Sequence, residues 1–343
     1  MKTLRLGIIG AGSFVVKRHI PEILKIKDQV KLVSICRRDK KKLKIIGNLF
    51  KIDSLYSNHI EMLKNENLDL VLIASPHSLH YKHALDSLKF NCHVVIEKPM
   101  TTTLAESKKL IQFAKKKNKK IIPLLNPPFE NHLYKLKKII LNKSKFGNLE
   151  HANLTWLDYK SPFFGKGIFT SSQISKIMPT NFRLNKRLSS GGILFDSGCH
   201  LIAEVIWILN KKPNSIYASM NDLNSELRLT ITMIFKNSLF INLNIIGDSQ
   251  FKNRRVESCY WGSKQVARMT GKPFRIDISG SNSDKIKTVK NFNNINTPIK
   301  EAMNHINKNK KLEVTLDQSK TIISIIQSAY KSAKTGKKEL IRY

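Results

Sequence analysis

Short apolar runs alternate with amphipathic stretches through the first third of the chain, and this alternation restricts the fold more than any other feature. Strands are expected over residues 4–9, 30–36, 70–74, 93–97 and 121–125. Helices are expected between them, over residues 14–26, 79–89 and 104–117. The runs are rich in β-branched residues and lack polar alternation, as in strands that helices cover on both faces. Residues 1–125 are therefore predicted to form an α/β domain with a doubly wound parallel sheet.

The pattern changes after about residue 126, where short strands follow one another closely. Strands are expected over residues 149–157, 215–220, 227–235, 239–246 and 255–261, with one helix over 192–209 between them. A last apolar-periodic helix over about 316–333 precedes Gly336, and it can pack back near the first domain. Closely spaced strands joined by turn residues are typical of an antiparallel meander. Residues 126–343 are therefore predicted to form an α+β domain with a largely antiparallel open sheet.

The chain is strongly basic, with 60 Lys+Arg against 25 Asp+Glu and a net charge of +35. Most of these cations are lysines spread along the whole chain, without the arginine-rich, aromatic-interleaved patch that nucleic-acid binding favours. We therefore interpret the charge as a compositional bias toward surface lysine, with an anionic partner as the alternative. The lysine-rich runs at 40–44, 115–120 and 308–311 are expected to be solvated helix faces or ends.

The four cysteines, Cys36, Cys92, Cys199 and Cys259, contain no CxxC pair. This argues against a disulfide framework and a metal site, and it suits a reducing compartment. The apolar stretch 6–16 resembles a short signal peptide, but no small-residue cleavage site follows it. No window is expected to reach the length of a membrane span. The prediction is a cytoplasmic protein with no membrane or metal partner.

A glycine-rich turn stands between the first predicted strand and the first helix. Its residues are Gly10, Ala11, Gly12, Ser13 and Phe14. Glycines at this place let the backbone approach a pyrophosphate, which then sits on the N–H groups of the helix N-terminus. Dinucleotide-binding turns follow the pattern Gly-x-Gly-x-x-Gly or Ala, called the fingerprint. Val15 stands at its third conserved position, so the helix is expected to pack farther from the strand. The turn predicts dinucleotide binding.

The second strand ends with Cys36-Arg37-Arg38. An acidic residue at this place selects the free 2′-hydroxyl of NAD, whereas arginine accommodates the 2′-phosphate of NADP. Arginine is scarce in a chain that otherwise prefers lysine, so the adjacent pair favours NADP slightly. NAD stays open as the alternative, because arginine can also stack on adenine and Asp39 follows directly.

Two further strands end in residues that can take part in catalysis or ligand binding. Ligands of an open α/β sheet bind at the carboxyl ends of its strands. Lys98 is held at this edge between a buried strand and a proline, so the sheet fixes its position. His77 and His80 follow another strand at the same edge, and they are equally well explained as helix-capping or surface residues. The residues expected to contact the dinucleotide at this edge are Ser75, Pro76, His77, His80, Glu97, Lys98 and Asn126.

A third group of residues follows the pair Gly191-Gly192. Asp196 and His200 are four residues apart at the start of a helical pattern, so they are expected to share one helix face. A carboxylate beside an imidazole can hold its tautomer and raise its basicity, which makes a general base for a hydroxyl proton. A helix-capping aspartate and a structural histidine are the alternative.

These motifs together resemble the glucose–fructose oxidoreductase/inositol dehydrogenase (Gfo/Idh/MocA) family of nicotinamide enzymes. The specific part is the combination of Glu97-Lys98-Pro99 with Asp196-x-Gly198-x-His200. Phe182-Arg183 and the closing segment 329–333 extend the resemblance over nearly the whole chain. It implies a Rossmann domain followed by a substrate domain that often assembles into dimers or tetramers.

The resemblance also implies a reaction and roles for residues. Members oxidise or reduce a hydroxyl-bearing carbon of a sugar, cyclitol or nucleotide-linked sugar. His200 would take the hydroxyl proton, and Lys98 would hydrogen-bond the reacting oxygen. Asp196 would orient His200 or bind a neighbouring hydroxyl, and Arg183 joins these three as an expected contact of the small polyhydroxylated substrate. One departure bears on the substrate, since Asn126 is followed by prolines where members commonly have Arg-Phe.

Two other functions stay open at this stage. Some relatives recycle a bound NAD to break glycosidic bonds through oxidation, elimination and re-reduction, with no net use of cofactor. A non-catalytic, dinucleotide-binding regulatory protein is the other alternative. Such a protein should have lost part of the set Lys98, Asp196 and His200, and this chain retains all three.

Overall fold

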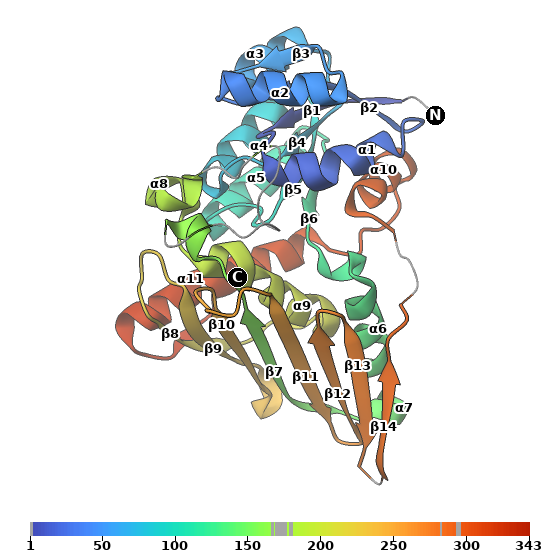
Figure 1. Cartoon of the computed structure of the whole chain (residues 1–343), viewed down its shortest axis with the longest axis vertical. Helices are drawn as coiled ribbons and strands as arrows, with labels where there is room; N and C mark the ends of the chain where they lie inside the picture. Colours follow the sequence, from blue (N-terminus) through green and yellow to red (C-terminus); the bar gives the residue numbers. More distant parts are fainter. Residues whose placement is uncertain (1–2, 166–167, 169–176, 178–180, 282, 293–295) are drawn as a thin grey trace. The chain divides into compact units, whose positions relative to one another are not determined.

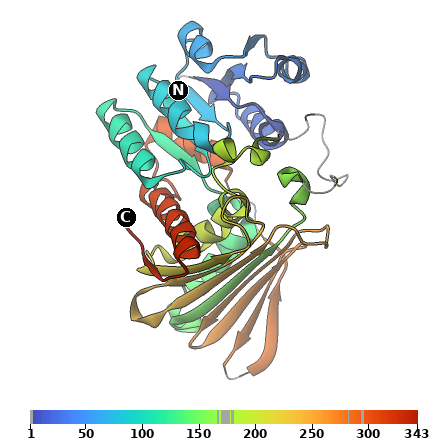
Figure 2. The same ribbon diagram turned by 90° about the vertical axis from the view of Figure 1, so that its left-hand side faces the viewer.

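The computed structural model describes residues 3–165, 168, 177, 181–281, 283–292 and 296–343. The chain divides into two compact units (Figure 1, and turned by 90° in Figure 2). Unit 1 comprises Met1–Leu125, Phe169–Ser190 and Asn296–Lys320. Unit 2 comprises Asn126–Ile168, Gly191–Ile295 and Thr321–Tyr343.

Unit 1 is built on a six-stranded sheet in which every neighbouring pair is parallel. Its strands follow the order β3-β2-β1-β4-β5-β6. This is the doubly wound order, with the switch point between β1 and β4. The parallel sheet predicted from the sequence is confirmed. The strands are β1 (Leu4–Ile9), β2 (Val30–Cys36), β3 (Ser54–Tyr56), β4 (Leu70–Ile73), β5 (His93–Glu97) and β6 (Ile121–Leu124).

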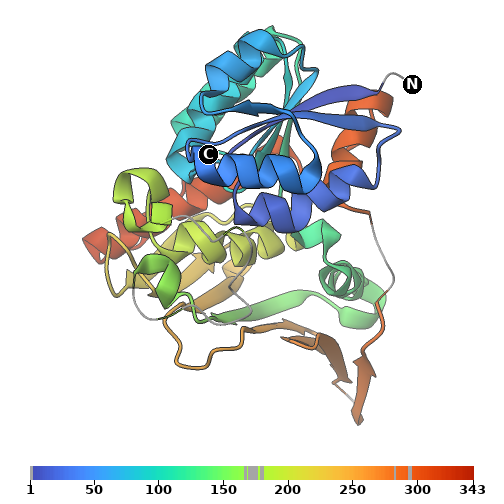
Figure 3. The same ribbon diagram turned by 45° about the horizontal axis from the view of Figure 1, so that its top comes forward.

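Helices cover both faces of this sheet (Figure 3), which explains why its strands lack polar alternation. Leu6 and Ile8 pack on one face, against α1 (Ile20–Leu24), α2 (Lys40–Phe50) and α10 (Pro298–Lys308). Val71 and Ile73 pack on the other face. The helices there are α3 (His59–Asn65), α4 (His80–Lys89) and α5 (Leu104–Lys116). The two core clusters thus follow the two-residue period of the strands.

The lysine-rich runs lie at helix ends, as expected. Residues 40–44 open α2, where the Asp39 side chain caps the helix by accepting the N–H of Lys42. Residues 115–120 comprise the last two residues of α5 and the four that follow it. Residues 308–311 begin with the last residue of α10 and continue beyond that helix. Most of these lysines are exposed. Hydrated cations at helix C-termini also complement the helix dipole.

Unit 2 is built on a nine-stranded sheet in the order β14-β13-β12-β11-β7-β10-β9-β8-β15. Only the central pair of β7 and β10 is parallel among these strands, so the largely antiparallel sheet is confirmed. The strands from β12 onward were not expected from the sequence. The strands are β7 (Leu149–Leu157), β8 (Ser215–Met220), β9 (Arg228–Ile234), β10 (Phe240–Ile246), β11 (Arg255–Gly262), β12 (Gln265–Gly271), β13 (Arg275–Gly280), β14 (Ser283–Val289) and β15 (Glu339–Leu340).

The two faces of this sheet differ in character. Helices α6 (Asn131–Ile140), α9 (Cys199–Leu209) and α11 (Leu316–Thr335) lie on one side of it (Figure 2), over buried residues such as Leu154 and Leu243. The other face is polar, with Thr230 Oγ1 donating to Asn244 Oδ1 at 3.1 Å. Hydrophobic and polar residues therefore alternate along these strands, as in a sheet covered on one face.

One helical stretch departs from the sequence analysis. By length and composition, the helical stretch Lys186–Leu209 could cross a membrane. The sequence analysis had predicted no segment long and apolar enough for this. However, 89% of its most apolar window is buried, and it is the single such helix in the described part of the chain. Within it, α9 buries Trp207 and its neighbours as a core helix does.

Candidate functional site

The glycine turn after β1 is shaped by close packing. Gly10 has a positive φ of 95°, and a Cβ atom there would lie 2.4 Å from the main-chain nitrogen of Ser75. Only glycine fits these two conditions. A Cβ atom on Gly12 would meet nothing closer than 3.8 Å, so the turn is open at this residue. The packing of the protein itself therefore does not require glycine at position 12.

The first helix begins with a π-turn, η1 (Val15–His19), in which the N–H of Ile20 bonds to the carbonyl of Val15. Single π-turns are frequent at functional sites. Val15, at the third fingerprint position, is buried in the core. The turn also places His19, which sequence reasoning missed, within the protein. A buried histidine in the helix that follows a glycine turn is a signal that could have revealed it.

Arg37 and Arg38 lie in different surroundings at the end of β2. Arg37 is buried, and its Nη1 donates to the carbonyl of Ala11 at 2.6 Å. Its Nε and Nη2 are buried without an acceptor in the described part of the chain. Arg38 is exposed. Asp39 caps α2 and pairs with Lys42, so its carboxylate already has partners.

His80 ties the ends of β4 and β5 together. Its Nδ1 faces the carbonyl of Pro99 at 2.7 Å, and its Nε2 faces the carbonyl of Ser75 at 2.8 Å. Burial lowers the pKa of His80, although these carbonyls oppose the effect. Both ring nitrogens are thus engaged by the main chain. The Ser75 hydroxyl faces His83 Nδ1 at 2.9 Å, a contact that the sequence did not indicate.

His77 and Arg183 also lie in unit 1. His77, in the turn η2 (His77–Leu79) that follows Pro76, faces the carbonyl of Ser189 with its Nδ1 at 3.1 Å. Its ring packs edge-on against Phe182, and the guanidinium of Arg183 lies 4.5 Å from the same Phe182 ring. Both pairs involve the short turn η6 (Asn181–Leu184). Phe182 is therefore the shared contact of two predicted ligand-binding residues.

Lys98 follows β5 and is half-buried at the carboxyl edge of the sheet. The carboxylate of Glu97 lies beside it, with Oε2 accepting the N–H of Lys98 at 3.1 Å and Oε1 accepting from His19 Nε2 at 2.7 Å. Burial raises the pKa of Glu97, but the hydrogen bond and charge of His19 and the charge of Lys98 outweigh it and lower that pKa. The structure thus brings the glycine turn and Lys98 to one edge of unit 1.

Asp196 and His200 lie in unit 2, where a second π-turn, η7 (Leu194–Gly198), leads into α9. Asp196 is buried, and His200 is half-buried. The imidazole of His200 stacks on the indole of Trp156, with 5.9 Å between ring centroids and 9° between planes. Asn126 is the first residue of unit 2, and its carbonyl accepts the N–H of Phe129.

A buried carboxylate, which the sequence did not indicate, holds the start of this segment. Glu226 accepts the N–H groups of Gly192 and Leu194 at 3.0 and 2.9 Å, and the hydroxyl of Tyr330 at 2.6 Å. Burial raises the pKa of Glu226, and these hydrogen bonds oppose the effect. A Cβ atom on Gly192 would lie 2.3 Å from the Glu226 carbonyl. The glycine pair therefore allows this segment to pack closely against Glu226.

Glu204 is the second buried carboxylate of unit 2. It lies on α9 one turn after His200, and its Oε1 accepts the hydroxyl of Tyr260 at 3.0 Å. Burial raises the pKa of Glu204 to about 7. Its position inside the core makes it a support for the helix that carries His200.

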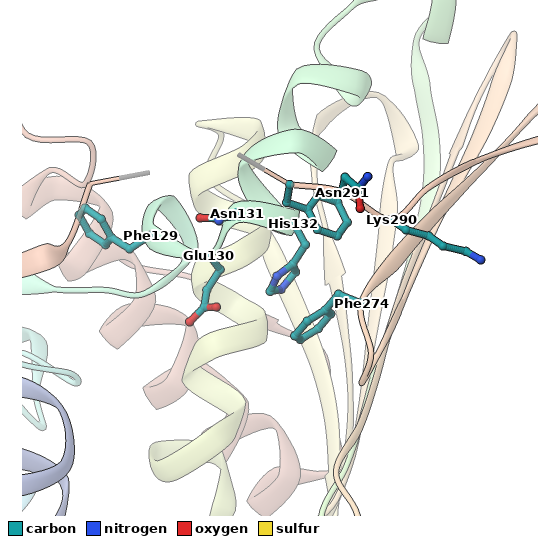
Figure 4. Close-up of a pocket in the computed structure, with 8 residues that line it drawn as sticks. Phe129, Glu130, Asn131, His132, Phe274, Lys290 and Asn291 are labelled. Carbon is teal, nitrogen blue, oxygen red and sulfur yellow. The ribbon is translucent and has the colours of Figure 1, made fainter. Parts of the chain in front are cut away.

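A pocket of about 520 Å³ opens elsewhere in unit 2 (Figure 4). The imidazole of His132 stacks on Phe274 there, with 3.5 Å between ring centroids. None of the predicted catalytic residues lines it, so it lies apart from the predicted chemistry. Its lining residues are Phe129, Glu130, Asn131, His132, Phe274, Lys290, Asn291 and Phe292.

The residues present at the edge of unit 1 fit a dinucleotide. Gly12 is not required by the packing of the turn, as expected where a diphosphate approaches the main chain, and the unsatisfied nitrogens of Arg37 lie beside the same turn. A helix N-terminus with a glycine turn is an anion-binding arrangement. In the described part of the chain, no group of three His, Cys, Asp or Glu side chains is arranged to hold a metal ion.

Comparison with known proteins agrees with this assignment of a dinucleotide fold. Residues 4–124 match the family model described as "Oxidoreductase family, NAD-binding Rossmann fold". Residues 134–261 match the model described as "GFO/IDH/MocA C-terminal domain". The two matches together cover most of the chain.

Two curated relatives show different extents of similarity. D-glucoside 3-dehydrogenase of Escherichia coli (strain K12) is 26% identical over 206 residues, which are 60% of this chain and 54% of that protein. The chain therefore spans about half the length of that relative. The scyllo-inositol 2-dehydrogenase (NADP(+)) IolW of Bacillus subtilis (strain 168) is 24% identical, covering 97% of this chain and 94% of that protein.

Solved structures share the fold over the whole chain. The WlbA dehydrogenase from Bordetella pertussis, in complex with NADH and UDP-GlcNAcA, has a TM-score of 0.81 at 18% identity and covers 100% of both chains. Aldose-aldose oxidoreductase from Caulobacter crescentus has a TM-score of 0.82 at 18% identity, covering 99% of this chain and 100% of that chain.

Proposed function

This chain belongs to the GFO/IDH/MocA family of oxidoreductases, and we propose that it is an NAD(P)-dependent dehydrogenase or reductase of a polyhydroxylated small molecule. The reacting group is a hydroxyl-bearing carbon of a sugar, cyclitol or nucleotide-linked sugar. The observation that carries the proposal is the occurrence of the open glycine turn and Lys98 at one edge of unit 1. Relatives named as D-glucoside and scyllo-inositol dehydrogenases support the same substrate class.

The roles of the side chains follow from what the reaction requires. A bound nicotinamide supplies or accepts the hydride, so the protein must bind the substrate and move one proton. In this proposal Lys98 hydrogen-bonds the reacting oxygen and His200 takes the hydroxyl proton, a contribution typically worth ~10²–10⁴ in rate. Asp196 orients His200 or binds a neighbouring hydroxyl. The remaining predicted contacts, including Arg183, Asn126 and the glycine turn, bind substrate or dinucleotide.

The preferred dinucleotide in this proposal is NADP. The carboxylate of Asp39, which would favour the ribose hydroxyls of NAD, caps α2 and pairs with Lys42. Two arginines remain at the end of β2, one buried with unsatisfied nitrogens and the other exposed. Guanidinium groups bind phosphate well. The relative IolW carries NADP(+) in its name, whereas the WlbA neighbour was solved with NADH.

A substrate panel tests the proposal directly. Sugars, cyclitols and nucleotide sugars are incubated with each dinucleotide, in both redox states, while the absorbance of the reduced nicotinamide is followed. Turnover of at least one class with a net absorbance change is expected. Cleavage of a glycoside without net change would instead identify a cofactor-recycling glycosidase. Tight dinucleotide binding without any turnover in the panel would favour a regulatory protein.

We further propose that the protein acts in the cytoplasm as a dimer or tetramer. All four cysteines are free and buried, which suits a reducing compartment. Light scattering coupled to size-exclusion chromatography measures the assembly, and a monomer at micromolar concentration would contradict it.

A further inference from the structure

Trp156 is the shared contact of two functional side chains in unit 2. The imidazole of His200 stacks on its indole, and the guanidinium carbon of Arg254 lies 4.8 Å from the centroid of the same indole. Trp156 stands on β7 directly opposite Val256 of β11, and Arg254 precedes Val256 by two residues. Arg254 and the residue that we propose as the general base therefore contact the same indole.

Arg254 is fixed in place by a buried carboxylate. Its Nε donates to Asp158 Oδ2 at 3.1 Å, and the Asp158 side chain is only 8% exposed. The Arg254 side chain is 38% exposed, and Nε is the nitrogen that bonds to Asp158. The ion pair thus uses one edge of the guanidinium and leaves the two terminal nitrogens for another group. An arginine held in this way is pre-organised to bind a planar anion with two parallel hydrogen bonds.

A second cation approaches the same carboxylate oxygen. Lys160 Nζ lies 3.8 Å from Asp158 Oδ2, and the Lys160 side chain is 16% exposed. One carboxylate oxygen of Asp158 therefore faces both Arg254 and Lys160.

We propose that these four residues, Trp156, Asp158, Lys160 and Arg254 (the Arg254 cluster), bind an anionic group of the substrate. The substrate is then an acidic sugar or cyclitol derivative, with a carboxylate or a phosphate at some distance from the reacting carbon. This inference rests on the proposed function, because it takes the surroundings of His200 to be the substrate site. Asp158 and Trp156 hold Arg254, and the terminal nitrogens of Arg254 contact the anion.

Binding to matched pairs of acidic and neutral probes tests the cluster. The pairs are D-glucuronate with D-glucose, D-gluconate with D-sorbitol, and D-glucose 6-phosphate with D-glucose. Calorimetric titration of the full chain, with and without NADPH, measures each dissociation constant and needs no turnover. The first two pairs test a carboxylate, and the third tests a phosphate.

Three variants assign any preference to Arg254. Arg254→Met removes the charge, and Arg254→Lys keeps a partner for Asp158 but cannot form two parallel bonds. Arg255→Met is the matched control, because Arg255 is the next residue, is exposed and stacks on Phe251. We expect Arg254→Met to weaken binding of the preferred acid by about 10- to 100-fold. Arg254→Lys should give an intermediate loss, and the neutral probes and Arg255→Met should show little change.

The outcomes separate this inference from the proposed function. Equal binding of acid and neutral probes in every pair would overturn the cluster as an anion site, and so would an equal loss in the Arg255→Met control. A preference for acid that depends on Arg254 would support it even if no probe is oxidised or reduced. Turnover of neutral substrates alone would support the dehydrogenase and reject the acidic substrate.

Discussion

The imidazole Nε2 of His19 lies 2.7 Å from Glu97 Oε1, and this contact joins the first helix of unit 1 to the end of β5. The other carboxylate oxygen accepts the main-chain N–H of Lys98. One carboxylate therefore links the π-turn after the glycine loop to the residue that we propose to bind the reacting oxygen. In this arrangement His19 is a positioning residue that acts through Glu97.

Replacement of His19 should loosen Lys98 without removing it. His19→Ala leaves Glu97 without its side-chain partner, and we expect the free energy of unfolding to fall by about 2 kcal/mol. The value of kcat should fall about tenfold or more, since small displacements of reacting groups are costly. His19→Gln can still donate to Glu97 and should recover part of kcat. Urea denaturation and steady-state kinetics measure the two effects.

The two readouts together identify the role. If His19→Ala loses stability while kcat and KM stay unchanged, the contact is purely structural and the positioning role is wrong. A fall in kcat that His19→Gln restores would support positioning.

Lys98 and His200 should be required for turnover but should contribute little to dinucleotide affinity, most of which we expect from the glycine turn. Lys98→Ala and His200→Ala are expected to lower kcat by about 10² to 10⁴, as for the loss of a proton-transfer group. NADPH affinity, measured by fluorescence titration, should change by less than about threefold, or roughly 0.6 kcal/mol. Normal turnover by either variant would show that its assigned role is wrong.

Glu204 should make the stability of the protein depend on pH. Burial raises its pKa from 4.5 to about 7, so the folded protein holds this proton more tightly than the unfolded chain does. Its contribution to stability is therefore complete below pH 4.5 and is lost as the pH rises to about 7. The shift corresponds to at most about 3 kcal/mol.

Glu204→Gln cannot lose a proton and should remove this pH dependence. The free energy of unfolding of the variant, relative to the wild type, should increase between pH 4.5 and about pH 7 and then stay constant. Glu257→Gln is the matched control, because Glu257 is exposed and pairs with Arg268 at the surface. A difference that is flat with pH would contradict the assignment to Glu204.

Much of the fold could be predicted because burial repeats with a simple period. The strands of unit 1 are largely apolar because helices cover both faces, and this pattern can be read without a structure. Strands β12 to β14 were missed because they carry few large apolar residues, so the apolar periodicity along them is weak. The helix α10 was missed as well, although its Thr297 cap and Pro298 are recognisable signals.

The site was predicted less completely, since its contacts join distant residues. The glycine turn, Lys98, Asp196 and His200 stand in motifs with local spacing. The contact of Arg254 with Asp158 depends on the pairing of β11 with β7, and that of His19 with Glu97 depends on a π-turn. Neither of these two contacts produces a local sequence pattern from which it could be predicted.

Arg38 should distinguish NADPH from NADH more sharply than Arg37 does. Arg38 is exposed and free of a turn contact, so Arg38→Ala should weaken NADPH by about tenfold or more and leave NADH almost unchanged. Arg37 also donates to the carbonyl of Ala11, so Arg37→Ala should weaken both dinucleotides. Fluorescence titrations with each reduced dinucleotide measure the four constants. Equal losses for NADPH and NADH in Arg38→Ala would overturn the preference for NADP.

Gly10 and Gly12 should respond to alanine in opposite ways. At Gly10 the positive φ and the 2.4 Å approach to Ser75 make any side chain strained, and we expect Gly10→Ala to cost about 3 kcal/mol of stability. At Gly12 a Cβ atom meets only ordinary contacts, so Gly12→Ala should fold with a stability within about 0.5 kcal/mol of the wild type. That Cβ atom would nevertheless fill the space through which a diphosphate approaches the main chain. NADPH affinity of Gly12→Ala should therefore fall about tenfold or more, measured by fluorescence titration beside thermal denaturation, and unchanged affinity would place the diphosphate elsewhere.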